Sequence, residues 1–347
     1  VYFIISSTTS NGIRSRLSQY LPNHLVLQMN DKYDYSSLLS RTKLEPANIS
    51  GRGLVKLDEV YEFQSAVPTD KETLNNFVMD KIKELNEKYK ITAPKIPVLP
   101  DVVTVSECSA SVLKLNAVPV GIEKESLNVR NVDVVKYFGH VITGMEFSDI
   151  QTFGGLFIKE ISNILNKQCY VFDMEKVYKD YAPYVSYFDN NILSCFKQFG
   201  KFVFDMYEKY KDSGFDMESL KSYGEYVCVI VGIDKFKNML GSEFDGAFGG
   251  LLSMIKTMPK VHFIFIDTVD NLKKCEFDPW YKDAISSTRC MWLGNGISTQ
   301  YTFKSTLSSR VLSTKLDKNF GYFIDGNTTV LVKYISEMGE EEDYERL

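Results

Sequence analysis

The stretch FGHVITGMEFSDIQT, from Phe138 to Thr152, decides the fold class. Its apolar first part predicts a buried strand over 138–143, Gly144 predicts a turn, and the next residues predict a helix that runs to about Leu165. A strand, a loop that opens on glycine and a helix form the frame of a phosphate-binding P-loop. The stretch therefore predicts an α/β protein with the geometry of a nucleotide site at this point.

The chemistry of a P-loop is absent from the same stretch. With Gly144 as the first glycine of G-x-x-x-x-G-K-[ST], the last variable position is Ser148. The G-K-[ST] triplet then falls on Asp149, Ile150 and Gln151, and the loop holds no lysine. Carboxylates at the mouth of the loop repel a triphosphate, which lysine and backbone amides would bind. The sequence predicts a degenerate nucleotide site at these five positions.

Two later strand ends are further candidates for this site. The apolar run 226–233 predicts a strand that ends at Asp234, a Walker-B pattern in which the acid holds Mg²⁺. The alternative is an ordinary acid at a helix N-terminus, where it favours the helix dipole. Lys235 stands where active motors commonly have a glutamate, and Thr268 follows the strand predicted over 261–267, where a polar sensor would lie.

Alternating strands and helices predict the architecture. Further strands are expected over 169–173 and the run 226–233, and helices over 192–214 and 245–258. Near-continuous apolar strands separated by helices favour a mostly parallel sheet covered on both faces. We therefore expect a three-layer P-loop NTPase fold of the RecA-like or FtsK type, with the hairpin over 321–334 extending the sheet edge.

A weak internal repeat suggests the domain organisation. VYFIISSTTSN at 1–11 matches VHFIFIDTVDN at 261–271, and a glycine-led hairpin pattern at 53–64 matches the one at 321–334. Chance similarity of two buried strands is the alternative. We expect the end of a preceding module over 1–66, a helix and proline linker over 67–100, a second module over 101–336 and an acidic tail over 337–347.

The linker region combines a helix with spaced prolines. The helix is expected over 69–90, with Thr69 and Glu72 at capping-box spacing and an apolar stripe that would pack on its own module or bind a partner. Prolines at 94, 97 and 100 favour an extended connector.

Composition excludes several functions. The last eleven residues hold six acids and one arginine, and the remaining 39 acids balance 39 bases. This balance argues against a dedicated nucleic-acid-binding surface. Six cysteines without C-x-x-C and three distant histidines argue against a metal site or a histidine-based triad. No apolar run approaches 18 residues, so we expect no membrane-spanning helix in this chain.

Both tryptophans lie in one aromatic stretch. Trp280 and Tyr281 follow Pro279 in a polar loop and are candidate partner-binding residues on the surface. Core packing is the preferred interpretation for Trp292, which lies in a predicted strand.

Several of these motifs resemble a known family. The segments LVL to DY (25–35) and GRGL (51–54) resemble the closing part of an FtsK/SpoIIIE-type ATPase module, and VPVGIEK (118–124) resembles the lead-in to the next one. Together with FIDTVDNLKKCEFDPWYK and WLGNGI, the pattern is similar to the C-terminal end of the EssC/EccC family, the coupling ATPases of type VII secretion.

The resemblance implies a cellular role. Proteins of this family carry transmembrane helices and a string of ATPase modules at the cytoplasmic face of the bacterial membrane, and they drive export of WXG100-type proteins. The implied partners are the preceding modules of the same chain, WXG100-type substrates and other type VII components. In actinobacterial relatives the final module can bind the substrate's C-terminal signal.

Three hypotheses for function remain at this point. The first is a degenerate module for substrate recognition and assembly, the second an active ATP-hydrolysing motor, and the third a DNA translocase. The missing P-loop lysine and the Asp234-Lys235 pair favour the first, while ATP and Mg²⁺ stay open as ligands. The neutral body of the chain disfavours the third.

Overall fold

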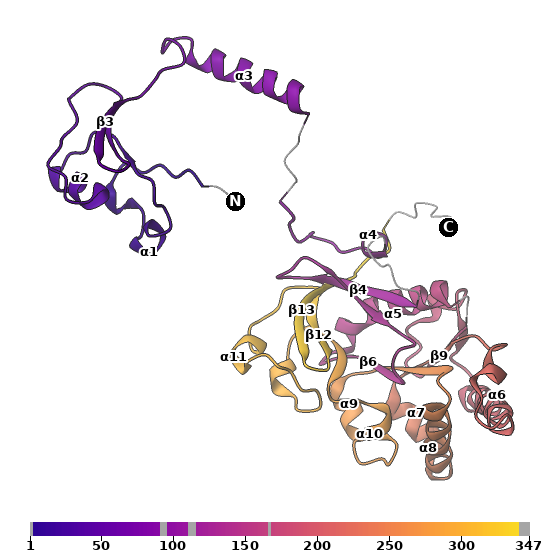
Figure 1. Ribbon diagram of the computed structural model, residues 1–347. Coiled ribbons are helices and arrows are strands. Elements are labelled where there is room, and N and C mark those ends of the chain that lie inside the picture. The colour runs from indigo at the N-terminus through magenta and orange to yellow at the C-terminus, as the bar shows by residue number, and fades with distance from the viewer. Residues whose placement is uncertain (1–2, 91–95, 110–115, 166–167, 340–347) are drawn as a thin grey trace. The chain divides into compact units, whose positions relative to one another are not determined.

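The chain divides into two compact units, Val1–Lys95 and Ile96–Leu347. The computed structural model describes residues 3–90, 96–109, 116–165 and 168–339 (Figure 1). The expected acidic tail beyond residue 339, the residues Val1 and Tyr2 and the linker proline Pro94 lie outside the described residues.

The second unit is built on a sheet whose described part has ten strands, in the order β5-β4-β13-β12-β11-β6-β10-β9-β7-β8. The run from β11 to β8 is parallel throughout. All six residues of β10 are buried, as a central strand with a helix layer on each face requires. These strands are β6 Gly139–Gly144, β7 Cys169–Asp173, β8 Ser186–Phe188, β9 Tyr226–Val231, β10 Val261–Ile266 and β11 Arg289–Leu293. The predicted α/β fold with a mostly parallel sheet is confirmed.

The remaining strands of this sheet are antiparallel: β4 Ala117–Glu123, β5 Val129–Asp133, β12 Phe320–Asp325 and β13 Thr328–Tyr334. The β12–β13 hairpin turns at Gly326 as predicted, but the expectation that it ends the sheet is wrong. β13 pairs with β4, so β5 and β8 are the edges. Gly121 permits this pairing, because a Cβ there would lie 2.3 Å from the Lys333 carbonyl oxygen.

Helices cover both faces of the sheet (Figure 1). On one face α5, Phe147–Ile164, contributes Phe153 and Phe157 to a buried cluster. On the other face three helices pack around Phe196 and Phe248: α6 Ile192–Asp212, α7 Ile233–Leu240 and α8 Ser242–Thr257. The predicted helix stop at Gly214 is confirmed by its φ of +75°. Within the described residues, no helix is both long and apolar enough to cross a membrane.

Short helices join these elements. The α-helical ones are α4 Val105–Ser109, α9 Val269–Lys274, α10 Tyr281–Ala284 and α11 Ser309–Leu312. The 3₁₀ turns are η2 Lys179–Tyr181, η3 Met217–Leu220 and η4 Ile297–Thr299.

The first unit contains a small antiparallel sheet in the order β1-β2-β3, with bounds Leu25–Val26, Arg52–Lys56 and Val60–Gln64. Strand order and sense are the same as in β11-β12-β13. Its helical segments are η1 Ser10–Gly12, α1 Ser15–Ser18 and α2 Lys32–Leu39. The strand expected over 1–6 is not formed in its described part, where Ile4 is fully exposed. Unlike β10, this segment has no strand beside it among the described residues of its unit, so nothing pairs with its backbone.

The helix expected over 69–90 is α3, Leu74–Tyr89. It begins after Thr73, so Thr69 and Glu72 precede the helix and the predicted capping box is wrong. Thr69 instead shares a hydroxyl–hydroxyl hydrogen bond of 2.8 Å with Thr73. No residue of α3 is buried within the described chain, so its apolar stripe does not pack on its own unit as preferred from the sequence.

Candidate functional site

The connection between β6 and α5 occupies the position of a P-loop. β6 ends at Gly144 and α5 begins at Phe147, so only Met145 and Glu146 lie between them. The predicted turn at Gly144 is wrong, because this residue is the last of the strand and pairs with Leu293. A Cβ on Gly144 would lie 2.6 Å from the Leu293 carbonyl oxygen, so the close approach of β11 explains the glycine.

A phosphate cradle needs a loop whose backbone amides converge on the ligand. Here the pattern positions from Phe147 to Gln151 already belong to the helix. Ile150 stands at the position of the P-loop lysine, and its side chain is fully buried in the core beside Phe153. A side chain at this position therefore points into the protein rather than toward a ligand.

The hollow that remains beside this connection is small and acidic. It measures about 260 Å³ and is lined in part by Ser148, Asp149, Asp317 and Lys318. Partial burial, with a smaller effect of Glu146, raises the pKa of Asp149. Gly294, with φ +73°, packs against the same carboxylate, because a Cβ there would lie 2.3 Å from Asp149 Oδ2. Two carboxylates beside one lysine make a poor environment for a polyanionic triphosphate.

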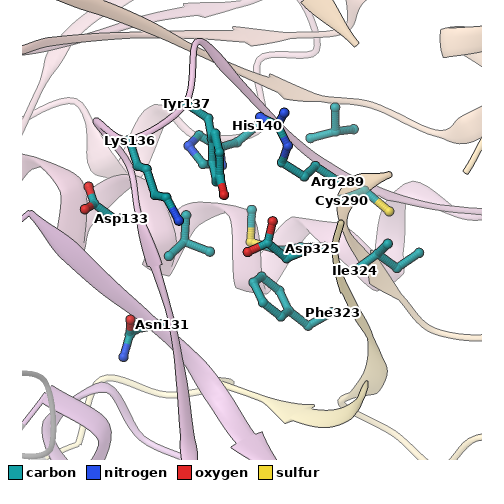
Figure 2. Close-up of a pocket in the computed structure, with 13 residues that line it drawn as sticks. Asn131, Asp133, Lys136, Tyr137, His140, Arg289, Cys290, Phe323, Ile324 and Asp325 are labelled. Atoms are coloured by element: carbon teal, nitrogen blue, oxygen red, sulfur yellow. The ribbon is translucent and has the colours of Figure 1, made fainter. Parts of the chain in front are cut away.

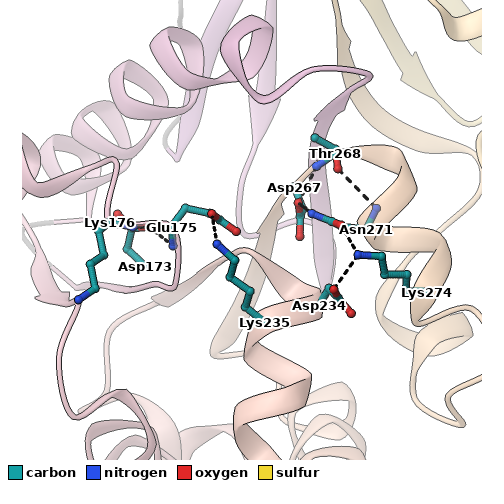
Figure 3. A network of polar contacts seen from close by, with 9 residues as sticks. All are labelled: Asp173, Glu175, Lys176, Asp234, Lys235, Asp267, Thr268, Asn271 and Lys274. Atoms are coloured by element: carbon teal, nitrogen blue, oxygen red, sulfur yellow. Dashed lines mark hydrogen bonds and ion pairs between the residues drawn. The ribbon is translucent and has the colours of Figure 1, made fainter.

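The Walker-B position is also altered. β9 ends at Val231 and Gly232 follows with φ +78°, so the expectation that the strand ends at Asp234 is wrong. Asp234 lies in the first turn of α7, as the helix-terminus alternative predicted, and its Oδ2 is 2.8 Å from Lys274 Nζ. Lys235 Nζ is 2.5 Å from Glu175 Oε2 (Figure 3).

Thr268 caps a helix. Its Oγ1 accepts a hydrogen bond from the Asn271 amide at the start of α9, at 3.4 Å. Asn271 in turn donates to Asp267 at 2.8 Å and accepts from Lys274 at 2.8 Å. Asp234 and Thr268 thus lie in one network of protein groups (Figure 3), in which Lys274 links them.

Two buried acids at strand ends escaped the sequence analysis. Asp173, at the end of β7, is fully buried and accepts hydrogen bonds from three backbone amides at 2.8 to 3.1 Å and from the Tyr187 hydroxyl at 2.8 Å. Asp267 follows β10, and burial raises its pKa. Their loops are held by these carboxylates. No group of three histidine, cysteine or acidic residues in the described chain is arranged to hold a metal ion.

The predicted surface position of Trp280 is wrong. Its indole is 4% exposed and packs edge to face against Phe248, with ring centroids 5.0 Å apart. Trp292 is fully buried, so its assignment to the core is confirmed. Tyr281 is buried as well, but it lines a hollow at the amino-terminal ends of the parallel strands, the opposite end from the P-loop position.

Another hollow lies at the same amino-terminal ends of the strands. It measures about 370 Å³, and Figure 2 shows Tyr137, His140, Arg289 and Asp325 among the residues that line it. The sequence analysis singled out none of these four residues. No local pattern marks them, because β6, β11 and β12 bring them together from distant parts of the chain.

Comparison with known proteins agrees with this fold. The chain matches no family profile. It is 31% identical over 136 residues to the ESX secretion protein EccC of Geobacillus thermodenitrificans and 26% identical over 134 residues to EccC of Thermomonospora curvata. YukB of Bacillus subtilis is 26% identical over 154 residues. These matches span 37 to 42% of this chain and only 9 to 10% of the relatives.

Solved structures extend the likeness over 94% of the chain. ATPases 2 and 3 of EssC from G. thermodenitrificans align with a TM-score of 0.71 at 18% identity, and the alignment covers 63% of that structure. ATPases 2 and 3 of T. curvata EccC, solved in complex with a signal sequence peptide, align with a TM-score of 0.52 at 18% identity over 60% of that structure.

The fold defines the class: an FtsK-type P-loop ATPase fold. Within that class, the chain is similar to the ESX secretion proteins named EccC, EssC and YukB.

Proposed function

We propose that this chain is part of a type VII secretion ATPase, and that its second unit recognises substrates and supports assembly without hydrolysing ATP. The observation that carries this proposal is the two-residue connection between β6 and α5, with Ile150 buried at the lysine position. That connection offers only the backbone amides of Met145 and Glu146 before the helix begins, which is shorter than the loop that cradles phosphates in a P-loop, and phosphoryl transfer depends on such contacts.

The residues around the Walker-B position support the same view. Asp234 and Lys235 are both engaged in ion pairs with protein groups, Lys274 and Glu175. A magnesium ion or an attacking water would have to displace these contacts. These ion pairs connect α7 to α9 and to the loop after β7, so they stabilise the packing of these elements.

The proposed partners follow from the relatives. ATPases 2 and 3 of T. curvata EccC were solved with a signal sequence peptide, which supports recognition of a substrate segment by this chain, and WXG100-type proteins are the substrates that we propose. The shared strand order of β1-β2-β3 and β11-β12-β13 supports a tandem repeat, with residues 1–66 closing a preceding module, 67–100 as linker and 101–336 as the second module. The whole protein would then act at the cytoplasmic face of the bacterial membrane with other type VII components.

Calorimetric titration of the full chain with ATP–Mg²⁺, together with a phosphate-release assay, tests the absence of hydrolysis. We expect no phosphate release above the buffer rate. Turnover that Asp234→Ala abolishes, while Asp205→Ala on the exposed surface of α6 leaves it intact, would establish an active motor instead.

Substrate recognition is tested separately, by measuring retention of a purified WXG100-type protein on the immobilised chain. We expect retention without nucleotide and no change when ATP is added. Lack of retention under both conditions would overturn the recognition role and leave the conclusion about hydrolysis untouched.

A further inference from the structure

Two hollows at the amino-terminal ends of the parallel strands share part of their walls. The first, of about 370 Å³, lies between β5, β6, β11 and β12. The second, of about 700 Å³, is lined by the start of β6, by α10 and by the residues that follow α10. Both include Lys136, Tyr137 and Arg289 in their walls. A ligand long enough to occupy both hollows would cross the Tyr137–Arg289 pair.

Arg289 is the group in this region best placed to hold an anion. Its guanidinium lies over the Tyr137 ring at 3.9 Å from the centroid, so the planar cation is held in place by a cation–π contact. No ion pair or hydrogen bond joins this guanidinium to another side chain in the described chain. Its N–H donors match the two oxygens of a carboxylate. Lys136 Nζ lies 4.8 Å from the same ring and adds a second positive charge.

His140 offers a buried acceptor in the first hollow. The side chain is 6% exposed, and Nε2 has no hydrogen-bond partner among the described residues. Burial first, and then His262 and Arg289, lower the pKa of His140 to about 3, so the ring is neutral. The Val134 backbone takes the hydrogen bond of the other ring nitrogen, which assigns the lone pair to Nε2. An N–H or O–H group of a ligand would donate a hydrogen bond to this lone pair.

The second hollow holds two more buried polar atoms of this kind. Neither the Tyr281 hydroxyl nor Thr302 Oγ1 has a hydrogen-bond partner within the described part of the chain. Both residues line the hollow. Buried polar atoms in folded proteins are almost always hydrogen-bonded. The three unsatisfied atoms that line these two neighbouring hollows therefore point to a polar ligand that supplies donors and acceptors in succession.

Charge and surface narrow the class of ligand. Asp133 and Asp325 border the first hollow, and Figure 2 shows the Tyr137 side chain pointing toward Asp325. Two carboxylates disfavour a polyphosphate or nucleic acid, whereas they accept N–H groups well. Met291 and Phe323 provide an apolar wall. A polypeptide combines an alternating series of N–H and C=O groups with acidic and apolar side chains, and it fits all of these features.

We infer that the two hollows form one groove for an extended polypeptide segment, in which an acidic side chain pairs with Arg289 next to an apolar one. The inference rests on the proposed recognition role and specifies where it takes place. The groove lies at the opposite end of β6 from the degenerate P-loop, so peptide binding and the former nucleotide site are separate.

The test uses the full chain and a fluorescein-labelled peptide of the last twenty residues of a WXG100-type substrate, with binding followed by fluorescence anisotropy. We expect Arg289→Gln to weaken binding about ten-fold or more, as loss of a charge-assisted pair does. Arg310→Gln, on an exposed arginine of α11, is the matched control and should bind as the wild type does.

Tyr281→Phe and Thr302→Val separate binding from folding. Each replaces an unsatisfied buried hydroxyl by an apolar group of nearly the same shape, so the melting temperature should stay equal or rise, while affinity falls about three-fold or more.

Replacing the acidic residues of the peptide by their amides should weaken binding to the wild type but add little to the loss in Arg289→Gln.

The outcomes are distinct. Wild-type binding that survives all three substitutions in the groove would overturn the groove and leave the recognition role intact. Absence of peptide binding by the wild type would overturn both. Equal effects of the peptide amides on the wild type and on Arg289→Gln would rule out the predicted pairing with that arginine.

Discussion

Trp280 illustrates how a single side chain acts in this fold. The residue follows a proline in a polar stretch, yet its indole fills a space between α8 and the segment that leads to α10. There it contacts Phe248, which in turn packs edge to face on Phe263 of the central strand, with centroids 6.2 Å apart. The tryptophan therefore links the outer helices to the middle of the sheet.

Trp280→Ala should destabilise the second unit by about 3–5 kcal/mol, since a large buried aromatic leaves a cavity when it is truncated. Phe277→Ala, three residues earlier, is the control, because its ring is 90% exposed and its loss should change stability by less than about 0.5 kcal/mol. Urea denaturation of both variants measures the difference. Equal stability of the two would contradict the buried position of the indole.

Among the helices, α5 packs along one face of the sheet. Two adjacent glycines inside it let the segment around η2 approach the helix directly. A Cβ on Gly154 would lie 2.2 Å from the Tyr178 hydroxyl, and one on Gly155 would lie 2.3 Å from Tyr181 Cε2. Tyr178 is 1% exposed, so its ring has little room to move away.

Gly154→Ala should therefore destabilise the protein by about 1–3 kcal/mol through overpacking, although alanine is the better helix former. Gly200→Ala in α6 is the opposite case, because no atom lies within 4 Å of the added Cβ. It should stabilise the protein by about 0.5–1 kcal/mol. Thermal denaturation of the two variants tests this opposite sign, and a shift in the same direction for both would refute the packing of Tyr178 on Gly154.

On the scale of the whole molecule, the two units differ in how much apolar surface they bury. The second unit encloses large clusters on both faces of its sheet. The buried cluster of the first unit consists of Val26, Tyr35, Leu39 and Leu54. Small cores offset the conformational entropy of folding poorly, so the stability of this chain resides in the second unit.

Residues 96–347 expressed alone should consequently unfold in one cooperative transition, at the same temperature as the main transition of the full chain. Residues 1–95 alone should show no cooperative transition. Differential scanning calorimetry of the two fragments and the full chain decides this. A cooperative transition in the 1–95 fragment would show that its four-residue core suffices.

The sequence was most informative where residues interact with near neighbours in the chain. Val, Ile and Phe runs determine β7, β9 and β10, and Asp325-Gly326 determines the hairpin turn. The absence of the P-loop lysine could also be seen directly in the local sequence. Helix starts were less predictable, because Thr69 and Glu72 match a capping-box pattern that the folded chain does not use.

The fold class follows from the sequence alone: an α/β protein of the P-loop class without the residues that bind triphosphate. The folded chain was needed to show that β6 passes into α5 through two residues and that Trp280 is buried. It was also needed to show that the hollows beside Arg289 lie at the other end of the sheet. The physical reason is the separation along the chain over which each interaction acts. Strand propensity and motif chemistry act between adjacent residues, whereas burial and groove formation depend on which distant strands pair.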